Sequence, residues 1–536
     1  MSARVCGGAK WHTSLCHLCH AAAAEDLCYT TRVARFLQFD SVSFSYPGMA
    51  APLLSGVSAF FPEGGWTGLV GANGSGKTTL LKLAAGLLPP SGGVIRQIGT
   101  SCYAMQRTDA PPAEWEDFMN CWDAAALDWR RRLGVSEDWA DRWDTLSHGE
   151  RKRVQIALAL WHAPDVLALD EPTNHLDARG KAVLLDALRR YRGAGLLVSH
   201  DRDFLDALCS QCLFLFPPRA TMRPGGVTQG QEQDRREQAH ARERHDANAG
   251  KARRLAAAAQ QRREAAEQSA ARTKRLKERK PPAHDSDGRF QRGIAKLQGK
   301  DGWGFSQSAA LRARAAKLAA PDASIRVDYE LGFWLEGADV SRRNYVLDLP
   351  PGALDLGDGR RLVHPALQIR PDDRIALVGA NGLGKSTLVR HLLPRALVPP
   401  DRLLVIPQEI SEEESRRIHA DVRRLDDAPL GRIMTLVSRL GSRPARLLAS
   451  STPSPGEIRK ILLAQGVARG PHLIVMDEPT NHLDLPSIEC LETALADTPC
   501  ALLLVSHDAR FLAKLTRATW TLAPAAPGVV SLAVSP

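Results

Sequence analysis

The sequence lacks any long apolar run. No stretch of about 18 uncharged apolar residues occurs in the 536 residues, so we expect no segment that spans a membrane. The longest apolar runs, such as 166–169 and 473–476, are short, as buried parallel strands are. The start of the chain also lacks a basic segment followed by an apolar core and a cleavage site, so we expect no secretory signal and a cytoplasmic location.

Cysteine is sparse and unevenly placed. Four of the ten cysteines lie in the first 28 residues and the other six are scattered, as reduced cytosolic thiols usually are. Cys16 to His20 matches the C-x-x-C-H pattern of haem attachment, but that chemistry requires export and no signal supports it. We expect residues 1–35 to be a disordered extension that need not belong to the native protein, and Cys209 and Cys212 to be buried core residues.

Acidic residues are scarce in one segment. The chain has a formal net charge of +10, and residues 217–320 contain 24 Lys and Arg against 11 Asp and Glu. The surplus therefore belongs to this segment and not to the whole surface. Residues 229–280 contain no proline and only two glycines, a composition that favours long exposed helices. Pro281 and Pro282 would end the first helix, and 305–319 predicts a second one, which gives a helical hairpin with a basic stripe.

Three motifs occur twice with an offset of 307 or 308 residues. Gly71–Thr78 reappears as Gly379–Ser386, Leu169–Asp177 as Met476–Asp484, and Val198–Asp201 as Val505–Asp508. Two homologous domains separated by an insert explain this repetition. The predicted divisions are an extension at 1–35, a first domain at 36–216, a basic helical-hairpin linker at 217–324 and a second domain at 325–536.

Each repeat has the pattern of an α/β domain. In the first, 36–46 alternates apolar and polar residues as a half-buried strand does, and 67–70 is a buried strand that runs into a glycine-rich loop. Residues 78–88 have helical spacing, and 166–169 and 196–198 are further buried strands. Strands that alternate with helices predict a mostly parallel sheet with its ligand at the carboxyl ends of the strands.

The glycine-rich loops have the spacing G-x-x-x-x-G-K-[ST]. Glycines let backbone N–H groups curl around a phosphate, and the following helix points its positive end at the same anion. Lys77 and Lys385 would neutralise phosphate oxygens, and Thr78 and Ser386 would ligate Mg²⁺. The candidate nucleotide-binding residues of the loops are Gly71, Asn73, Gly74, Gly76, Lys77, Thr78, Thr79, Gly379, Asn381, Gly382, Gly384, Lys385, Ser386 and Thr387.

Paired acids follow another predicted strand in each repeat. Asp170 and Asp477 end apolar strands, which suits a carboxylate that holds Mg²⁺ through water. Glu171 and Glu478 come next and are candidates for orienting and polarising an attacking water. The alternative is that these acids cap helices or end strands in solvent, but the two phosphate loops favour the catalytic interpretation.

Amide and imidazole side chains complete the pattern. Gln106 and Gln408 follow short strand-like segments and are candidates for sensing Mg²⁺ and water, against the alternative of solvated amides. His200 and His507 follow apolar strands and are candidates for a contact with the γ-phosphate, against ordinary structural histidines. Their matched positions in the two repeats favour function.

The order of these motifs resembles that of an ATP-binding-cassette domain. The family carries a phosphate loop, a Gln, a Leu-Ser-Gly-Gly-Glu signature, a Leu-Asp-Glu-Pro segment and a His, in that order. The signatures here are Leu146–Glu150 and Ser454–Glu457. They depart from the family pattern at His148 and Pro455, which puts the relative rates of the two sites in doubt. Ser147, Gly149, Ser454 and Gly456 are kept.

The resemblance implies two composite sites, because cassettes of this family pack head to tail around two ATP molecules. Site one would join Lys77, Thr78, Gln106, Asp170, Glu171 and His200 to Ser454 and Gly456. Site two would join Lys385, Ser386, Gln408, Asp477, Glu478 and His507 to Ser147 and Gly149. Tyr46 is a candidate for stacking on adenine, or else a core tyrosine, and no aromatic lies at the matching position near Leu354.

From about residue 36 onwards the chain most resembles the ABC-F group, which carries two cassettes and a charged helical linker on one chain. The resemblance implies an ATPase that uses ATP and Mg²⁺ and switches conformation with ATP. It also implies a ribosomal partner, as a translation factor or an antibiotic-resistance ribosome-protection protein, with tRNA or ribosomal RNA bound by the basic linker. We expect no membrane partner and a monomer with an intramolecular cassette pair.

Two other functions stay open. A DNA-associated ATPase in repair or recombination is disfavoured because only 29 residues follow His507, which leaves no C-terminal coiled coil of the kind that DNA-associated relatives carry. A transporter motor subunit would need a membrane partner, and a long basic insert has no role there. The linker itself has the alternative of being a merely solvated charged helix.

Overall fold

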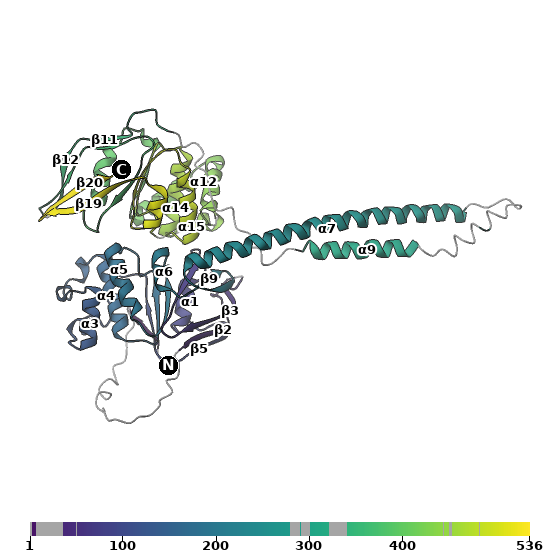
Figure 1. Ribbon diagram of the computed structural model, residues 1–536, viewed down its shortest axis with the longest axis horizontal. Helices are drawn as coiled ribbons and strands as arrows, with labels where there is room; N and C mark the ends of the chain where they lie inside the picture. Colours follow the sequence, from purple (N-terminus) through teal and green to yellow (C-terminus); the bar gives the residue numbers. More distant parts are fainter. Residues whose placement is uncertain are drawn as a thin grey trace, which may run out of the picture. The chain divides into compact units, whose positions relative to one another are not determined.

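The computed structural model describes residues 3–6, 36–49, 51–278, 290, 301–320, 340–357, 359–442, 444–449, 453–481 and 483–535. The chain divides into two compact units, Met1–Gly230 with Tyr329–Pro536, and Gln231–Asp328. The larger unit contains both repeats, and the smaller one contains the basic helical segment (Figure 1). None of the helices in these described ranges is long and apolar enough to cross a lipid bilayer.

The first repeat is built on a seven-stranded sheet of order β1-β6-β7-β8-β4-β9-β10. Neighbouring strands are parallel except for the final β9–β10 pair. Strands β4, β7 and β8 are buried along their whole length, which confirms the buried parallel strands predicted from the sequence. The strands are β1 (Ala3–Cys6), β4 (Trp66–Gly71), β6 (Ser101–Ala104), β7 (Val166–Asp170), β8 (Ala194–Val198), β9 (Gln211–Phe216) and β10 (Arg219–Pro224).

Both ends of the first repeat differ from the sequence-based expectation. Ala3–Cys6 pairs in parallel with β6, whereas a disordered extension was expected at 1–35; the rest of that extension, including Cys16, lies outside the described residues. At the other end, β10 pairs with β9, so residues 219–224 belong to the sheet and not to the linker predicted to begin at 217. Cys212, which lies on β9, is fully buried, as expected.

A smaller antiparallel sheet and a set of helices complete the first repeat. The sheet has the order β3-β2-β5, and alternating burial along β2 confirms the half-buried strand predicted from residue 36. Its strands are β2 (Phe36–Phe44), β3 (Leu54–Pro62) and β5 (Gly92–Gln97). The helices are α1 (Lys77–Ala84), α2 (Trp115–Asn120), α3 (Ala124–Leu133), α4 (His148–Trp161), α5 (Ala178–Arg189) and α6 (Arg202–Leu208), with 3₁₀ turns at Glu137–Trp139 and Trp143–Thr145.

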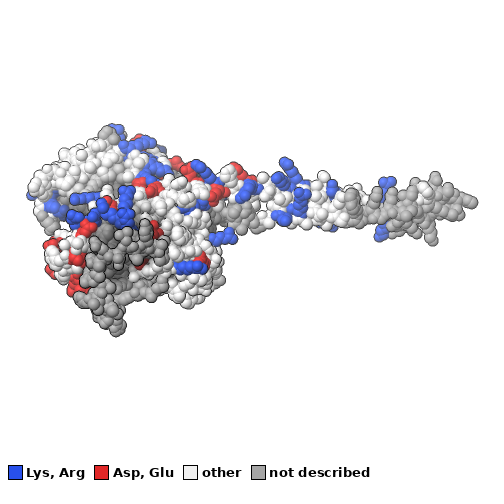
Figure 2. Space-filling model, turned by 60° about the horizontal axis from the view of Figure 1, so that its bottom comes forward, with Lys and Arg blue, Asp and Glu red and all other residues white. Residues whose placement is uncertain are grey.

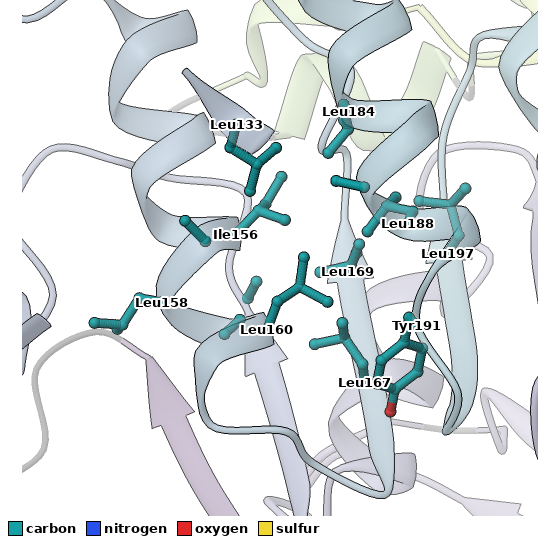
Figure 3. Packing of buried hydrophobic residues seen from close by; sticks show 14 of the residues in the cluster. Leu133, Ile156, Leu158, Leu160, Leu167, Leu169, Leu184, Leu188, Tyr191 and Leu197 are labelled. Carbon is teal, nitrogen blue, oxygen red and sulfur yellow. The ribbon is translucent and has the colours of Figure 1, made fainter. Parts of the chain in front are cut away.

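One apolar core of this repeat lies between the main sheet and its helices. Figure 3 shows Leu160 of α4, Leu167 of β7 and Leu188 of α5 converging on one cluster. All three side chains are almost completely buried, and burying a leucine of this kind stabilises a fold by about 1.5–3 kcal/mol. Leu485 of the second repeat belongs to the same cluster, so the two repeats share part of this core.

The second repeat has an eight-stranded sheet of order β12-β13-β20-β19-β15-β18-β17-β16, and a two-stranded sheet of β11 and β14. The central strands are parallel, as predicted. The β12–β13 hairpin joins the main sheet through β20, whereas the first repeat keeps β2, β3 and β5 in a separate sheet. The strands are β11 (Leu347–Leu349), β12 (Gly352–Gly357), β13 (Arg360–His364), β14 (Leu367–Ile369), β15 (Arg374–Val378), β16 (Leu403–Ile406), β17 (Leu473–Asp477), β18 (Ala501–Val505), β19 (Ala518–Ala526) and β20 (Val529–Ser535).

The helices of the second repeat cover its sheet and form a helical subdomain. A separate apolar cluster, which includes Val437, Leu447 and Ile461, joins α12, α13 and α14. The helices are α10 (Lys385–Leu392), α11 (Glu412–Arg423), α12 (Asp427–Arg439), α13 (Pro444–Ala449), α14 (Pro455–Ala468), α15 (Leu485–Ala496) and α16 (Ala509–Leu515), with 3₁₀ turns at Leu393–Arg395 and Pro400–Arg402.

The smaller unit contains α9 (Asp301–Leu318) and all of α7 (Val227–Glu278) except residues 227–230, which belong to the larger unit. Both predicted helices are confirmed. The expected break at Pro281 and Pro282 lies outside the described residues. The hydroxyl of Ser308 donates to the carbonyl oxygen of Ala259 at 2.9 Å, and Ala252, Ala259 and Ala266 are buried at seven-residue intervals along α7. Small residues at this spacing let the two helices approach closely.

The shared core of the first repeat gives a stability prediction. Leu184 of α5 is fully buried in the cluster, so Leu184→Ala should lower the free energy of unfolding by about 2–5 kcal/mol. Urea unfolding followed by tryptophan fluorescence measures this, because Trp115, Trp139 and Trp143 lie in the same cluster. Leu127→Ala, at a leucine that is 38% exposed, is the matched control, and equal midpoints for the two variants would contradict this account of the core.

Candidate active site

The candidate residues of each repeat gather at one edge of its main sheet. In the first repeat, β4, β6, β7 and β8 run parallel, so the loops that follow them meet at the carboxyl edge. These loops carry the phosphate-loop motif, Gln106, Asp170 with Glu171, and His200. In the second repeat, β15, β16, β17 and β18 place the matching residues in the same way.

The glycines of the two phosphate loops hold a backbone that other residues do not adopt easily. Gly76 and Gly384 have φ angles of 95° and 91° and precede α1 and α10 directly. A Cβ atom on Gly384 would lie 2.6 Å from Cδ2 of Leu356, so a side chain there would have to displace that leucine in addition to adopting the left-handed φ. These N-cap glycines supply no capping side chain, so the first N–H groups of both helices point into the loop with their hydrogens available to an anion.

A buried ammonium group lies inside each loop. Nζ of Lys77 lies 2.8 Å from the carbonyl oxygen of Gly71, and Nζ of Lys385 lies 2.7 Å from that of Gly379. Burial lowers the pKa of both lysines, although nearby carboxylates, Glu171 for Lys77 and Glu478 for Lys385, act in the opposite direction. A desolvated cation surrounded by N–H groups attracts anions strongly, so both loops fit a phosphate chain.

A carboxylate and a hydroxyl group lie near each lysine, and in the second repeat an amide oxygen joins them. In the first repeat, Oγ1 of Thr78 donates to Oδ2 of Asp170 at 2.8 Å, and the Tyr103 hydroxyl donates to the same oxygen at 3.1 Å. In the second, Oγ of Ser386 lies 3.3 Å from Oε1 of Gln408, and burial raises the pKa of Asp477. Oxygen ligands of these kinds are the ones that Mg²⁺ binds.

The two glutamine candidates differ in placement. The side-chain oxygen of Gln408 accepts a hydrogen bond from the hydroxyl of Ser386, next to the expected position of Mg²⁺. The side chain of Gln106 is exposed, and its contact with the surrounding site is made by its carbonyl oxygen, which accepts from Lys152 at 3.2 Å. The structure therefore brings one of the two amides into its oxygen cluster and leaves the other at the surface of the site.

The two glutamates have the same unusual backbone. Glu171 and Glu478 both have φ of 48°, a conformation that costs a non-glycine residue about 1–3 kcal/mol and clusters at active sites. Their N–H groups donate to the carbonyl oxygens of Val198 and Val505 at 2.9 and 2.8 Å, which fixes each carboxylate at the end of its strand. Burial, followed by the charge of Asp170, raises the pKa of Glu171 to about 8. Burial likewise raises the pKa of Glu478 to about 7.

The histidine candidates lie against these glutamates. Nε2 of His200 is 3.1 Å from Oε1 of Glu171. Nε2 of His507 is 3.6 Å from Oε1 of Glu478 and 3.1 Å from Nζ of Lys385. Burial, and then the charge of Lys385, lowers the pKa of His507 to about 4, so its imidazole is neutral at pH 7 and its contact with Glu478 is not an ion pair.

Each phosphate loop is hydrogen-bonded to the opposite repeat. The N–H of Asn73 donates to Oδ2 of Asp484 at 2.6 Å, and the N–H of Asn381 donates to Oδ2 of Asp177 at 3.4 Å. The Asn381 amide also donates to the carbonyl oxygen of His175 at 3.2 Å. The loop that contains Asn-His-Leu-Asp in one repeat therefore meets the phosphate loop of the other, as composite sites require.

The signature serines begin helices. Ser147 and Ser454 are the N-caps of α4 and α14, and each accepts from a backbone N–H while the following glutamate, Glu150 or Glu457, accepts in return. The signature is thus also a capping box, S-x-x-E, a signal that the sequence already contains. A Cβ on Gly149 would lie 3.0 Å from the His175 oxygen, so this signature loop packs directly on the loop that contacts Asn381.

Tyr46 lies on the surface beside the first phosphate loop. Its ring is 40% exposed and packs edge-on against Phe44 with centroids 4.9 Å apart. Its hydroxyl lies 3.0 Å from Oγ1 of Thr79. The exposed face is compatible with the predicted stacking on adenine, and the core alternative does not fit this exposure.

Sequence reasoning missed a buried cation in each repeat. Nζ of Lys152, on α4, contacts the carbonyl oxygens of Met105, Gln106 and Asp170 at 2.5, 3.2 and 3.4 Å. Arg459, on α14, donates to the Glu478 carbonyl at 2.6 Å and to that of Gln408. Both lie five residues after a signature serine, and this matched spacing is the sequence signal that could have identified them. Each ties the signature helix, the glutamine loop and the acid-bearing strand together.

A family model described as ABC transporter matches residues 54–174 and 362–481. These two ranges contain both phosphate loops, both glutamine candidates, both signatures and both Asp-Glu pairs. They leave out Tyr46 and the two histidines.

The chain is similar to several named proteins. It is 29% identical over 493 residues to the ATP-binding protein Uup of Caulobacter vibrioides, covering 88% of this chain and 75% of that protein. It is 27% identical over 470 residues to the erythromycin resistance ATP-binding protein MsrA of Staphylococcus epidermidis, covering 85% and 91%. It is 26% identical over 477 residues to the ribosome protection protein VmlR of Bacillus subtilis, covering 86% and 82%.

A solved structure described as "Model of ribosome-bound archaeal Pelota and ABCE1" contains a chain that aligns with a TM-score of 0.60. The alignment has 18% identity and covers 92% of this chain and 78% of that chain. At this identity the likeness concerns the fold alone.

The buried glutamate of the first repeat gives a pH-dependent prediction for the nucleotide-free protein in a chelator. The pKa of Glu171 is about 8 in the folded chain against a usual 4.5, so between these values the folded state holds a proton that the unfolded state has released. Stability therefore falls as pH rises through this window, and each pKa unit corresponds to about 1.4 kcal/mol. Glu171→Gln cannot lose a proton, so its melting temperature should exceed that of the unaltered chain by a margin that grows from pH 5 to pH 8.

Thermal unfolding at pH 5, 6, 7, 8 and 9 measures this margin. Glu137→Gln, at an exposed position of the same repeat, is the control and should show a margin that does not change with pH. A constant margin for Glu171→Gln across the range would mean that this carboxyl group is already ionised in the folded protein.

Proposed function

Because this chain is a tandem ATP-binding-cassette ATPase of the ABC-F family, we propose that it acts on the ribosome, as a translation factor or an antibiotic-resistance ribosome-protection protein. Two relatives are named for erythromycin resistance and for ribosome protection. The observation that carries the proposal is the basic helix pair, inserted between two domains whose phosphate loops each bond to the opposite repeat. The cytoplasm is where such a partner would be met.

The chain binds nucleotide, and we assign the binding to two composite sites. Site one consists of the phosphate loop of the first repeat, Gln106, Asp170, Glu171 and His200, together with Ser454 and Gly456 of the second. Site two consists of the phosphate loop of the second repeat, Gln408, Asp477, Glu478 and His507, together with Ser147 and Gly149 of the first. The contacts of Asn73 with Asp484 and of Asn381 with Asp177 support this pairing, with the two repeats of one monomer as partners.

The metal that such sites use is Mg²⁺. Thr78, Asp170 and Gln106 would hold it in site one, and Ser386, Asp477 and Gln408 in site two, since these side chains supply the oxygen donors that it prefers. Bound there, it would neutralise charge on the phosphates.

The catalytic roles follow from burial and geometry. We assign to Glu171 and Glu478 the task of orienting and polarising the attacking water, because a general base works best when its pKa lies near the working pH. His200 and His507 lie against these carboxylates and would hold the γ-phosphate. Lys77 and Lys385, whose partners are carbonyl oxygens of their own loops, would exchange those partners for phosphate oxygens.

The two sites differ in the buried cation that holds their backbone carbonyl groups. Lys152 supports site one and Arg459 supports site two at matching positions, and Arg459 makes the larger number of carbonyl contacts through its fork of N–H groups. His148 stands where the family signature has a glycine in the first repeat, and Pro455 stands at that position in the second repeat. We therefore propose that the two sites hydrolyse ATP at different rates.

The helix pair presents cations along its length. Arg253, Arg254, Arg262 and Arg263 are exposed on α7, and Arg312 is exposed on α9. Figure 2 shows Lys and Arg side chains along the described part of this helix pair. Arginines spaced along a rigid rod suit a phosphate backbone, which gives strong, salt-dependent affinity with little reading of sequence. We propose that this surface contacts tRNA or ribosomal RNA, and that ATP-driven closure of the repeats controls when it does.

The support from Arg459 predicts a catalytic effect. Arg459→Met removes the cation that holds the backbone of Glu478 and Gln408, and misplacement of a catalytic group by about 1 Å costs roughly 100-fold in rate. In a Glu171→Gln background, which silences site one, we expect ATP hydrolysis to fall about 10-fold to 100-fold. Arg459→Lys, which copies the residue of the first repeat, is the control and should retain most of the rate. An unchanged rate in the methionine variant, with normal thermal unfolding, would show that Arg459 does not support catalysis.

The ribosomal role is tested with Glu171→Gln/Glu478→Gln, which should bind ATP without hydrolysing it and stay closed. We expect this protein to migrate with ribosomes in a sucrose gradient only when ATP is present, and to be released as salt rises from 50 to 200 mM. Arg253→Ala/Arg254→Ala in the same background should weaken the association and its salt dependence. Absence from every ribosomal fraction, or DNA-stimulated hydrolysis by the unaltered chain, would overturn the proposal in favour of a DNA-associated ATPase.

A further inference from the structure

The two helices that follow the histidine candidates are joined to each other by ion pairs. Helix α6 begins two residues after His200 and α16 begins two residues after His507, each with an aspartate as N-cap. The guanidinium group of Arg510, on α16, pairs with Asp206 of α6 at 2.8 Å and also with Asp203. Beside this contact, the buried Glu492 of α15 pairs with Arg202 of α6 and with Lys514 of α16.

The same aspartate holds the first turn of α7. The N–H of Thr228 donates to Oδ1 of Asp206 at 3.0 Å, and the Thr228 hydroxyl donates to its other carboxylate oxygen. Nη1 of Arg510 donates to the Thr228 hydroxyl oxygen at 2.7 Å. A Cβ on Gly226 would lie 2.3 Å from Oδ1 of Asp206, so the chain that enters α7 is seated directly on α6. One guanidinium group from the second repeat therefore contacts both the last helix of the first repeat and the start of α7.

This arrangement has no copy at the matching positions. The offset of 307 residues places Asp203 opposite Arg510, Leu185 opposite Glu492, and Ala207 opposite Lys514. Charge of opposite sign or no charge stands at each position. Because the rest of the site is repeated, the asymmetry marks this cluster as a feature of the side from which α7 begins. Burial would raise the pKa of Asp206, but hydrogen bonds from Thr228 and Arg510 lower it, so its carboxylate is ionised at neutral pH.

We propose that Arg510 is the positioning residue that couples closure of the two repeats to the ordering of the first turn of α7. When the repeats close, Arg510 reaches Asp206 and Thr228 and fixes the first turn of α7. When they part, that turn keeps its bonds to Asp206 and the packing of Val227 in the core of the first repeat, but it loses the bond from Arg510. Because such coupling is reciprocal, any ligand held by the α7–α9 pair must change the affinity for ATP by the same factor. The inference rests on the proposed nucleotide sites and is independent of the ribosomal partner.

The test is hydrogen exchange, measured by mass spectrometry on the full-length Glu171→Gln/Glu478→Gln chain with and without ATP and Mg²⁺, in the absence of ribosomes. We expect ATP to slow exchange in both phosphate loops and in peptides that cover residues 227–240. With Arg510→Ala added, protection of the two phosphate loops should remain, while at least half of the ATP-dependent protection of residues 227–240 should be lost.

Two further variants separate coupling from simple destabilisation. Lys514→Ala removes a cation from the same interface that contacts Glu492 and not α7, and it should leave protection of residues 227–240 intact. Thr228→Val keeps the shape of the side chain but removes the hydroxyl, and it should reproduce the Arg510→Ala loss. The proposal is overturned if Arg510→Ala leaves residues 227–240 fully protected, or if Lys514→Ala removes that protection equally. If ATP does not slow exchange at the phosphate loops of the Glu171→Gln/Glu478→Gln chain, the result would count against the nucleotide sites instead.

Discussion

Hydrogen bonds from each phosphate loop to an aspartate of the opposite repeat are the constraint on which the rest of the structure depends. Asp177 and Asp484 accept from Asn381 and Asn73, and each aspartate also caps the helix that follows it. The two bonds that cross between the repeats can form only while each phosphate loop lies against the opposite repeat. The two phosphate loops are thereby each held against the opposite repeat, and Leu485 completes an apolar core of the other repeat.

Burial of the two glutamates is the second constraint on the proposed chemistry. Glu171 and Glu478 are removed from water and held in a strained backbone conformation, and their pKa values rise towards neutrality. A carboxylate of this kind is poorly solvated and accepts a proton readily, which is what the activation of water requires. Desolvation and backbone strain at the two glutamates are offset by packing of the surrounding core. Lys152 and Arg459 also hold the nearby carbonyl groups in place.

The sequence predicted most of the fold because its signals were local and occurred twice. Glycine loops, apolar strands and the Asp-Glu pairs each depend on a few neighbouring residues, and the repeat confirmed that they were no accident. The helices at α7 and α9 followed from composition alone. The β9–β10 hairpin was missed because Pro217 and Pro218 looked like the start of a linker, although they form the turn between two strands.

Contacts between residues that are distant in the chain could not be predicted from the sequence. Asp177 and Asp484 lay in a recognised motif, but only the folded pair reveals that each serves the other repeat. Lys152 and Arg459 were hidden among the many cations, and Arg510 has no counterpart that a repeat comparison would find. The exposed side chain of Gln106, against the bonded Gln408, likewise depends on loop geometry that the matching sequence positions do not fix.

The most direct test of this account is an experimental structure of the Glu171→Gln/Glu478→Gln chain with ATP and Mg²⁺. We expect two ATP molecules, each bound by one phosphate loop and contacted by the signature serine of the opposite repeat, Ser454 in site one and Ser147 in site two. ATP held by either phosphate loop without a contact from the other repeat, in a chain that is fully loaded, would contradict the composite sites.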